Sequence, residues 1–127
     1  MHTLPTSHLA PALRAQAEGS YTAEAAVELL IGHGVWLARR DFLNELVEYA
    51  GDSTTITHAW VAWEHVPTFA NRAPCSGSEG RILRLAAELH GTDTGVPLAE
   101  LLSQLDDTNS ALVRDAIDHI LSHGGRR

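Results

Sequence analysis

The sequence predicts a mainly α-helical fold: a compact bundle of five or six helices with a small β-ribbon or strand near residues 54–61. Two observations lead to this fold class. Apolar residues recur at helical spacing in most segments, with capping residues before them and glycines after them. Residues 54–61 break the pattern, because they are rich in β-branched side chains and carry no helical stripe.

Helices dominate the expected structure of the first half. Three segments carry apolar stripes at helical spacing: a short one from Leu9 to Leu13, one over 22–31 and one over 41–50. Thr22 and Asp41 stand at the N-cap positions of the second and third segments. Gly34 and Gly51 are placed to end the same two helices.

The β-branched segment needs a second strand to pair with. The nearest apolar candidate is 35–37, the link between the two longer helices of the first half. After the strand, residues 63–72 are expected to form a helical turn or two. Pro67 limits that helix, since proline is tolerated only in the first turn.

The last third carries the clearest helical signals. Ser76 and Glu79 have the spacing of a capping box. Pro97 fits the first position of the next helix, and Asp106 or Asp107 caps the final one. Short connections suggest that these helices pack together as a three-helix core over 76–123. Their stripes are expected to meet at five side chains: Leu85, Leu101, Leu102, Ile117 and Leu121.

Length and composition indicate one domain over 1–127, in which 1–19 is the least regular part. The chain has 127 residues, 44% of them apolar, and its net charge is −7 with histidines neutral. It contains no lysine, so its nine basic residues are all arginine. Because an acidic surface repels phosphate backbones, we do not expect nucleic-acid binding.

The compartment is also suggested by the sequence. No apolar run approaches the roughly 18 to 20 residues that span a bilayer. The first residues lack the basic and apolar regions of a signal peptide, and a single cysteine cannot form an internal disulfide. We therefore expect a cytoplasmic protein without a membrane partner.

Several short stretches follow one another in a characteristic order: Ala25-Ala26-Val27-Glu28-Leu29-Leu30, Trp36-Leu37 before Asp41-Phe42, Ala59-Trp60, Cys75-Ser76 with Glu79, and Leu105-Asp106-Asp107. In this pattern of stretches, which covers 22–123, the chain resembles short uncharacterised proteins that are common in actinobacteria. The resemblance implies no activity, so any function has to be argued from the residues themselves.

Cys75 and Arg81 have the C-x5-R spacing of the phosphate loop in cysteine-dependent phosphatases. A helix N-terminus would lower the thiol pKa, and the arginine would bind phosphoryl oxygens. Such loops follow a buried strand, which residues 69–74 do not resemble, and Glu79 would place a carboxylate beside the anion. The alternative is a half-buried thiol in front of a capping box.

Asp115, His119 and His123 follow at helical intervals of four, so they share one face of the last helix. Two histidines four residues apart can chelate zinc, and the aspartate could add an oxygen ligand. This is also the polar face of an amphipathic helix, and histidine is favoured near a helix C-terminus. We therefore treat these residues as weak metal candidates and expect no cofactor.

The central segment concentrates the three tryptophans, Trp36, Trp60 and Trp63. Aromatic anchors surrounded by polar residues are typical of interface centres, and His58 would share a strand face with Trp60. The alternative is that the indoles anchor a small core, with their N–H groups bonded to backbone carbonyls. These tryptophans are the candidate interaction residues.

Arg39 and Arg40 precede the predicted Asp41 helix and suggest a helix-turn-helix. That helix carries Glu45 and Glu48, which DNA would repel, so a solvated arginine pair is the simpler interpretation. The sequence predicts a non-catalytic acidic protein that acts through protein–protein interaction, as an adaptor or homo-oligomer. Two alternatives stay open: a winged-helix-like transcriptional or nucleic-acid regulator, and a small cysteine-dependent enzyme using Cys75 and Arg81.

Overall fold

The computed structural model describes residues 6–51 and 55–124, and the side chains of 8–51 and 55–122. Over these residues the chain forms seven α-helices and one antiparallel pair of strands. The helices are α1 (Thr6–Ala17), α2 (Tyr21–His33), α3 (Arg40–Leu46), α4 (Val66–Arg72), α5 (Gly77–His90), α6 (Leu98–Leu102) and α7 (Asp107–Gly124). The strands are β1 (Val47–Gly51) and β2 (Ile56–Val61), and two 3-10 turns are η1 (Trp36–Ala38) and η2 (Trp63–His65).

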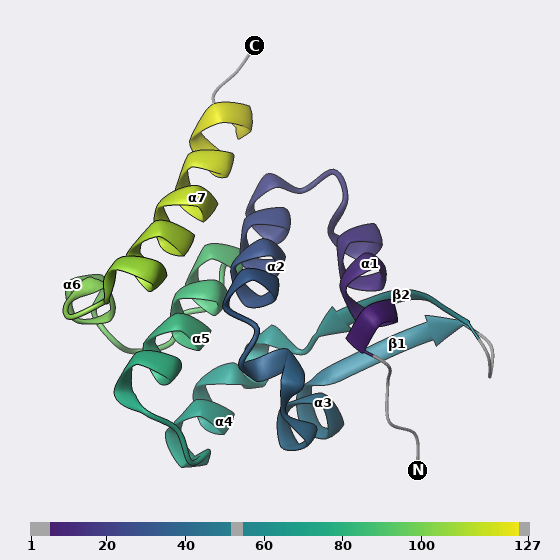
Figure 1. Cartoon of the computed structure of the whole chain (residues 1–127), viewed down its shortest axis with the longest axis horizontal. Coiled ribbons are helices and arrows are strands. Elements are labelled where there is room, and N and C mark those ends of the chain that lie inside the picture. Colours follow the sequence, from purple (N-terminus) through teal and green to yellow (C-terminus); the bar gives the residue numbers. More distant parts are fainter. Residues whose placement is uncertain (1–5, 52–54, 125–127) are drawn as a thin grey trace.

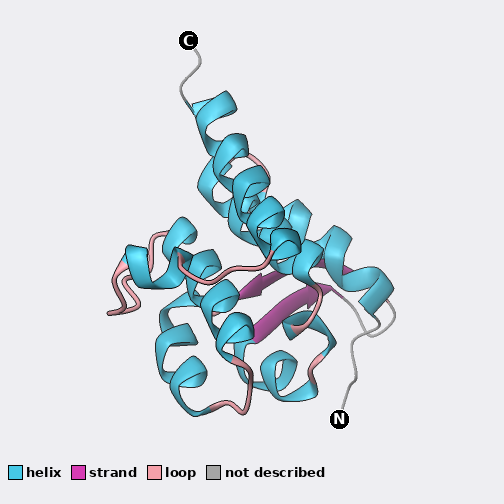
Figure 2. Ribbon diagram, turned by 60° about the vertical axis from the view of Figure 1, so that its left-hand side comes forward, coloured by secondary structure: helices cyan, strands magenta, loops and turns pink. Residues whose placement is uncertain are grey.

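The predicted fold class is confirmed, with seven α-helices in place of five or six. Figure 1 shows α2 in the middle of the molecule, and α2 packs against α1, α5 and α7. Figure 2 places the two short strands among the surrounding helices. Since α1 packs on β2, the hairpin is tied to the helical part of the fold.

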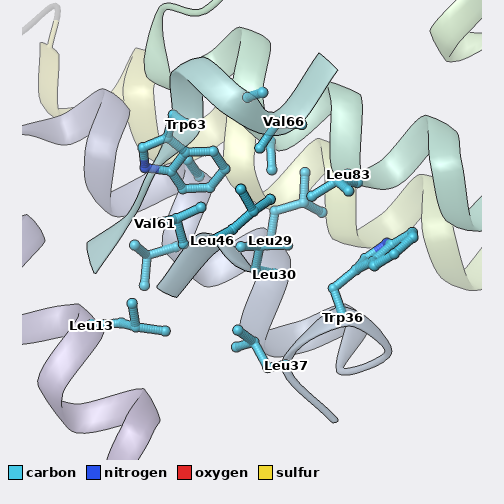
Figure 3. Packing of buried hydrophobic residues seen from close by; sticks show 14 of the residues in the cluster. Leu13, Leu29, Leu30, Trp36, Leu37, Leu46, Val61, Trp63, Val66 and Leu83 are labelled. Atoms are coloured by element: carbon cyan, nitrogen blue, oxygen red, sulfur yellow. The ribbon is translucent and has the colours of Figure 1, made fainter. Parts of the chain in front are cut away.

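The core is built around α2. Leu29 and Leu30 occupy its centre, between Trp63 on one side and Trp36 on the other (Figure 3). Phe42 and Phe69 join Trp36, and the three ring centroids lie 5.7 to 5.9 Å apart in tilted or edge-on pairs. Such pairs add to the free energy gained from burying the rings.

The hairpin replaces part of a predicted helix. The helix expected over 41–50 ends at Leu46, and the residues after it form β1. β1 pairs with β2, with Val47 opposite Val61, so the predicted pairing with 35–37 is wrong. Those residues lie in or beside the turn η1. Apolar spacing could not separate the two states, because Val47 also completes the helical stripe.

The predicted helix boundaries of the first half were only partly correct. Ser20, and not Thr22, caps α2, since its Oγ accepts from the Ala23 N–H. Asp41 lies in the first turn of α3, whose N-cap is Arg39. Gly34 ends α2 as predicted: it adopts φ 79°, and its N–H donates to the Leu30 carbonyl. Gly51, by contrast, ends β1 rather than a helix.

The capping box of α5 is confirmed. The Glu79 N–H donates to Ser76 Oγ at 3.1 Å, and the Ser76 N–H donates to Glu79 Oε1 at 3.0 Å. The cap of α7 is Asp106, whose Oδ1 accepts from the Asn109 N–H at 2.7 Å. Pro97 is the N-cap of α6 rather than its first helical residue.

Three of the five side chains expected to meet in a C-terminal core are exposed: Leu102, Ile117 and Leu121, the last with 69% of its surface accessible. Leu85 and Leu101 are buried as predicted. Both α5 and α7 pack against α2, which separates the stripes that were expected to meet. Periodicity shows which residues share a helix face, whereas the neighbouring helices determine how much of that face is covered.

None of the described helices combines the length and the hydropathy that a bilayer-crossing segment requires.

Candidate functional site

Trp36 belongs to the core. The side chain is fully buried, and its Nε1 donates to the Glu79 carbonyl at 2.9 Å. The guanidinium of Arg39 lies 4.6 Å from the centre of the Trp36 ring. Trp36 therefore joins η1 to the start of α5 and has no accessible surface to offer a partner, so its assignment as an interaction residue is wrong.

Trp60 and Trp63 differ in exposure. Trp63 keeps 6% of its surface and stacks on His90, with ring centroids 5.1 Å apart and planes 19° from parallel. Trp60 is half-buried, and its Nε1 donates to Glu48 Oε1 across the hairpin at 3.2 Å. The strand register places His58 on the same face as Trp60, as expected, while Ala59 faces the core.

The two tryptophans line one cavity of about 510 Å³, which we call the Trp60 cleft. Its walls come from α1, α2, β2, η2 and the end of α5: Leu13, Gln16, Ala17, Ala23, Val27, Ala59, Trp60, Val61, Trp63, Glu64, His90 and Thr92. Figure 3 shows Leu13, Val61 and Trp63 on the same side of the core. The volume and the mostly apolar lining are typical of ligand-binding sites in proteins.

The polar groups of the cleft are few. Burial lowers the pKa of the His90 imidazole below its ordinary value of 6.5, although Glu64 acts in the opposite direction. His90 is therefore neutral near pH 7 and can both donate and accept a hydrogen bond. Glu64 is exposed at the edge, and its Oε2 lies 3.8 Å from Nε2 of the exposed His65. Of the described residues that line the cleft, Glu64 is the one acidic residue, and none is an arginine.

Cys75 and Arg81 do not form a phosphate loop in this structure. Helix α4, and not a strand, precedes the segment, and Cys75 is exposed rather than half-buried. The Ser76 N–H, which would face an anion, is already occupied by the Glu79 carboxylate. The Arg81 guanidinium lies along the first turn, where a Cβ on Gly77 would be 3.4 Å from its Nη1.

The predicted metal candidates are separated by their contacts. His119 Nε2 lies 2.7 Å from Glu24 Oε1, which joins α7 to α2, and its ring meets Tyr21 edge-on. Asp115 is exposed, and the side chain of His123 lies outside the described residues. Over the part of the chain that the structure describes, no cluster of three histidine, cysteine or acidic residues is arranged to hold a metal ion.

Arg39 is a structural residue rather than one of a solvated pair. Its guanidinium donates to both Asp41 oxygens, at 3.0 and 2.6 Å, and to the Pro74 carbonyl at 2.6 Å. The hydrogen bonds from Arg39 hold the pKa of the Asp41 carboxyl below its ordinary value. Together with its contact to Trp36, this ties the start of α3 to the loop before α5.

Helix α3 runs directly into the β1–β2 hairpin, which is the order of elements that a winged-helix regulator needs. The charges on this part of the molecule do not suit DNA. Glu45 forms an ion pair with Arg72, and Asp41 with Arg39, so two nearby guanidinium groups are already neutralised. Arg40 is exposed at the start of the same helix. The order of elements is therefore present without a basic surface on α3.

Comparisons of the chain with protein-family models, with curated proteins and with solved structures gave no match. The resemblance to actinobacterial proteins therefore stays a prediction. The Trp60 cleft is the candidate functional site, because it combines a half-exposed tryptophan, an apolar cavity and a small set of polar groups.

Proposed function

We propose that this chain is a non-catalytic acidic protein of the cytoplasm that works by binding another protein, and that the Trp60 cleft is its working surface. The single observation that carries the proposal is that Trp60, half-exposed on the hairpin, lines a cavity of about 510 Å³. A cavity beside an accessible indole can receive a side chain from a partner. Hot spots of protein interfaces are enriched in tryptophan and lie in such pockets.

Two further features support a binding role. Most of the described cleft lining is apolar, so a partner side chain would gain free energy from leaving water. Five different elements contribute to the walls, and three of them (α1, α2 and α5) are helices anchored in the core. A site held by packed helices changes little on binding, which reduces the entropy cost of association.

The test replaces Trp60 and compares the loss of binding with the loss of stability. Full-length protein, Trp60→Ala and the control Tyr49→Ala are immobilised, and each is exposed to extract from its native host. Tyr49 is an exposed aromatic residue of the neighbouring strand that does not line the cleft. Light scattering at two protein concentrations covers self-association, and circular dichroism confirms that each variant is folded.

We expect a partner, or a second copy of the chain, to bind wild type and Tyr49→Ala and to be lost with Trp60→Ala. Equal binding by all three folded proteins would show that the cleft is not the working surface. That outcome would leave the exposed Ile117 and Leu121 of α7 as the next surface to examine.

A further inference from the structure

We infer that β1 is an edge for self-association, at which two copies of the chain pair their β1 strands antiparallel through the backbone of Tyr49. The described lining of the Trp60 cleft includes no residue of β1, so this edge is a second surface and goes beyond the proposed function. Three features of the hairpin support the pairing: the direction of its backbone hydrogen bonds, the exposure of β1 and the charges beside it.

The hydrogen bonds of the hairpin determine which backbone groups of β1 face outward. The Ala62 N–H donates to the Leu46 carbonyl at 2.7 Å, and Val47 lies opposite Val61. In an antiparallel pair, every second residue of a strand exchanges hydrogen bonds with the neighbouring strand. The even-numbered residues therefore bond to β2 here, and the N–H and C=O of Tyr49 point away from β2.

This outer edge is open to another strand. Neither backbone group of Tyr49 that points away from β2 forms a hydrogen bond with another described residue. Every residue of β1 after Val47 is exposed, so neither face of the strand is covered there. Outward N–H and C=O groups along a strand are satisfied by the backbone of a second extended strand, which makes a strand the natural occupant of this edge.

The usual protection of an edge strand is missing from β1. Edges are commonly guarded by proline, by charged side chains or by a covering helix. β1 contains no proline and no basic residue, and its one charged side chain, Glu48, accepts a hydrogen bond from Trp60 of its own hairpin. Helix α1 packs on β2, whereas β1 contacts β2 and the helix α3 that runs into it. The irregular register lies between Ala50 and Gly51, past Tyr49.

The edge is complementary to a second copy of itself. When two β1 strands run antiparallel with Tyr49 opposite Tyr49, each Tyr49 N–H can donate to the Tyr49 carbonyl of the other copy. Glu48 then lies opposite Ala50, so no like charges are directly opposed, and the two tyrosines form a cross-strand aromatic pair. The product is a four-stranded sheet, which is closer to the usual size of a stable sheet than a lone hairpin.

The charges beside the edge allow two copies to approach. Helix α3 and β1 together carry four charged residues: Arg40, Asp41, Glu45 and Glu48. Both carboxylates of α3 already form ion pairs, with Arg39 and Arg72. The two remaining charges, on Arg40 and Glu48, have opposite signs. The net charge of −7 therefore arises elsewhere in the chain, and its repulsion between copies is screened by salt.

The experiment measures sedimentation equilibrium of the full-length chain from about 5 µM to about 1 mM, in about 0.3 M salt to screen the net charge. Wild type is compared with Tyr49→Pro, Tyr49→Ala and Trp60→Ala, and circular dichroism confirms that each variant is folded. Tyr49→Ala removes the side chain and keeps both backbone groups, whereas Tyr49→Pro also removes the N–H. Proline is tolerated on an edge strand where the N–H faces solvent, so the hairpin can still form.

Two short strands bury less surface than a standard interface, so we expect wild type to dimerise with a Kd of about 10–300 µM. Tyr49→Ala and Trp60→Ala should each change this Kd by less than about fivefold. Tyr49→Pro should weaken the dimer at least about tenfold more than Tyr49→Ala, because both central hydrogen bonds are lost.

Hydrogen exchange tests the same pairing in wild type, without any substitution. The Tyr49 amide is open to water in the monomer and bonded in the dimer. Its exchange rate, followed by NMR, should therefore fall at least about twofold when the protein concentration is raised from about 20 µM to about 1 mM.

Three results would each overturn the inference: a chain that stays monomeric up to about 1 mM, a folded Tyr49→Pro that dimerises like Tyr49→Ala, or a Tyr49 amide whose exchange does not depend on concentration. A dimer that is lost with Trp60→Ala and kept with Tyr49→Pro would also overturn the pairing of β1, but it would support the proposed function, since self-association would then use the cleft. If the chain stays monomeric, the extract comparison with Trp60→Ala still decides the proposed function separately.

Discussion

The exposure of the three tryptophans can be tested by replacing each with alanine and measuring the free energy of unfolding. Trp36 is fully buried between Phe42 and Phe69, so its removal leaves a large cavity. Truncating a buried tryptophan costs about 3–5 kcal/mol. Its lost hydrogen bond to the Glu79 carbonyl adds a further cost of about 0.5–1.5 kcal/mol.

The same reasoning gives a lower value for Trp60. Its side chain is half-buried, and its hydrogen bond to Glu48 is exposed, so water can replace both the contact and the bond. We expect Trp60→Ala to cost about 1 kcal/mol, in the range of most single substitutions. Trp63 keeps only 6% of its surface, so Trp63→Ala should fall near Trp36→Ala.

The assay is urea unfolding followed by circular dichroism at 222 nm, with all variants analysed by linear extrapolation. Domains are stable by only about 5–15 kcal/mol, so Trp36→Ala could be unfolded in water. Trp36→Phe is therefore included, because it keeps an aromatic ring and removes the bond to Glu79. A cost below about 1 kcal/mol for Trp36→Ala, or above about 3 kcal/mol for Trp60→Ala, would refute this assignment of core and surface.

Four further results are expected. Leu101→Ala should cost about 2–5 kcal/mol, because Leu101 is 1% exposed, whereas Leu121→Ala should cost less than about 0.5 kcal/mol; equal losses in urea unfolding would contradict the helix packing. Burial lowers the pKa of His90 in the folded chain, so the unfolded chain binds this proton more readily. Its stabilising contribution is complete above pH 6.5 and is lost as the pH falls through the folded-state pKa. The free energy of unfolding measured in urea should therefore decrease less for His90→Gln than for wild type when the pH is lowered from about 7.5 to about 5.5. Equal decreases in the two proteins would contradict this. Purified protein should not hydrolyse an aryl phosphate above background, whereas turnover that Cys75→Ser abolishes would make the thiol a nucleophile. Duplex DNA should bind weakly and without sequence preference in an anisotropy titration at about physiological salt, and sub-micromolar, sequence-dependent binding would favour the regulator instead.

The helical signals of the sequence identified most elements because they depend on neighbours within a turn or two. The Ser76–Glu79 capping box spans three residues, and both of its hydrogen bonds are present. Gly34 supplies the left-handed residue that ends α2. Local geometry alone determines features of this kind, so they can be predicted without knowing the rest of the fold.

The candidate site was only partly predictable. All three tryptophans were identified as candidates, but the pattern could not distinguish the buried Trp36 and Trp63 from the half-buried Trp60. The other walls of the cleft come from residues as distant in sequence as Leu13 and His90. Their side chains carry no motif, and the cleft forms only because α1 and the end of α5 lie beside β2 and η2.

The sequence by itself determined the mainly helical class, the position of β2, the capping box of α5 and the glycine that ends α2, because periodicity and caps act over a few residues. Only the tertiary structure decided that 47–51 leave the helical pattern to pair with β2, and that Ile117 and Leu121 stay exposed. It also decided that Arg39 joins Asp41, Trp36 and the Pro74 carbonyl instead of facing solvent. The physical reason is that burial and pairing are set by which distant segments meet, and an amphipathic stripe specifies only that a surface is apolar.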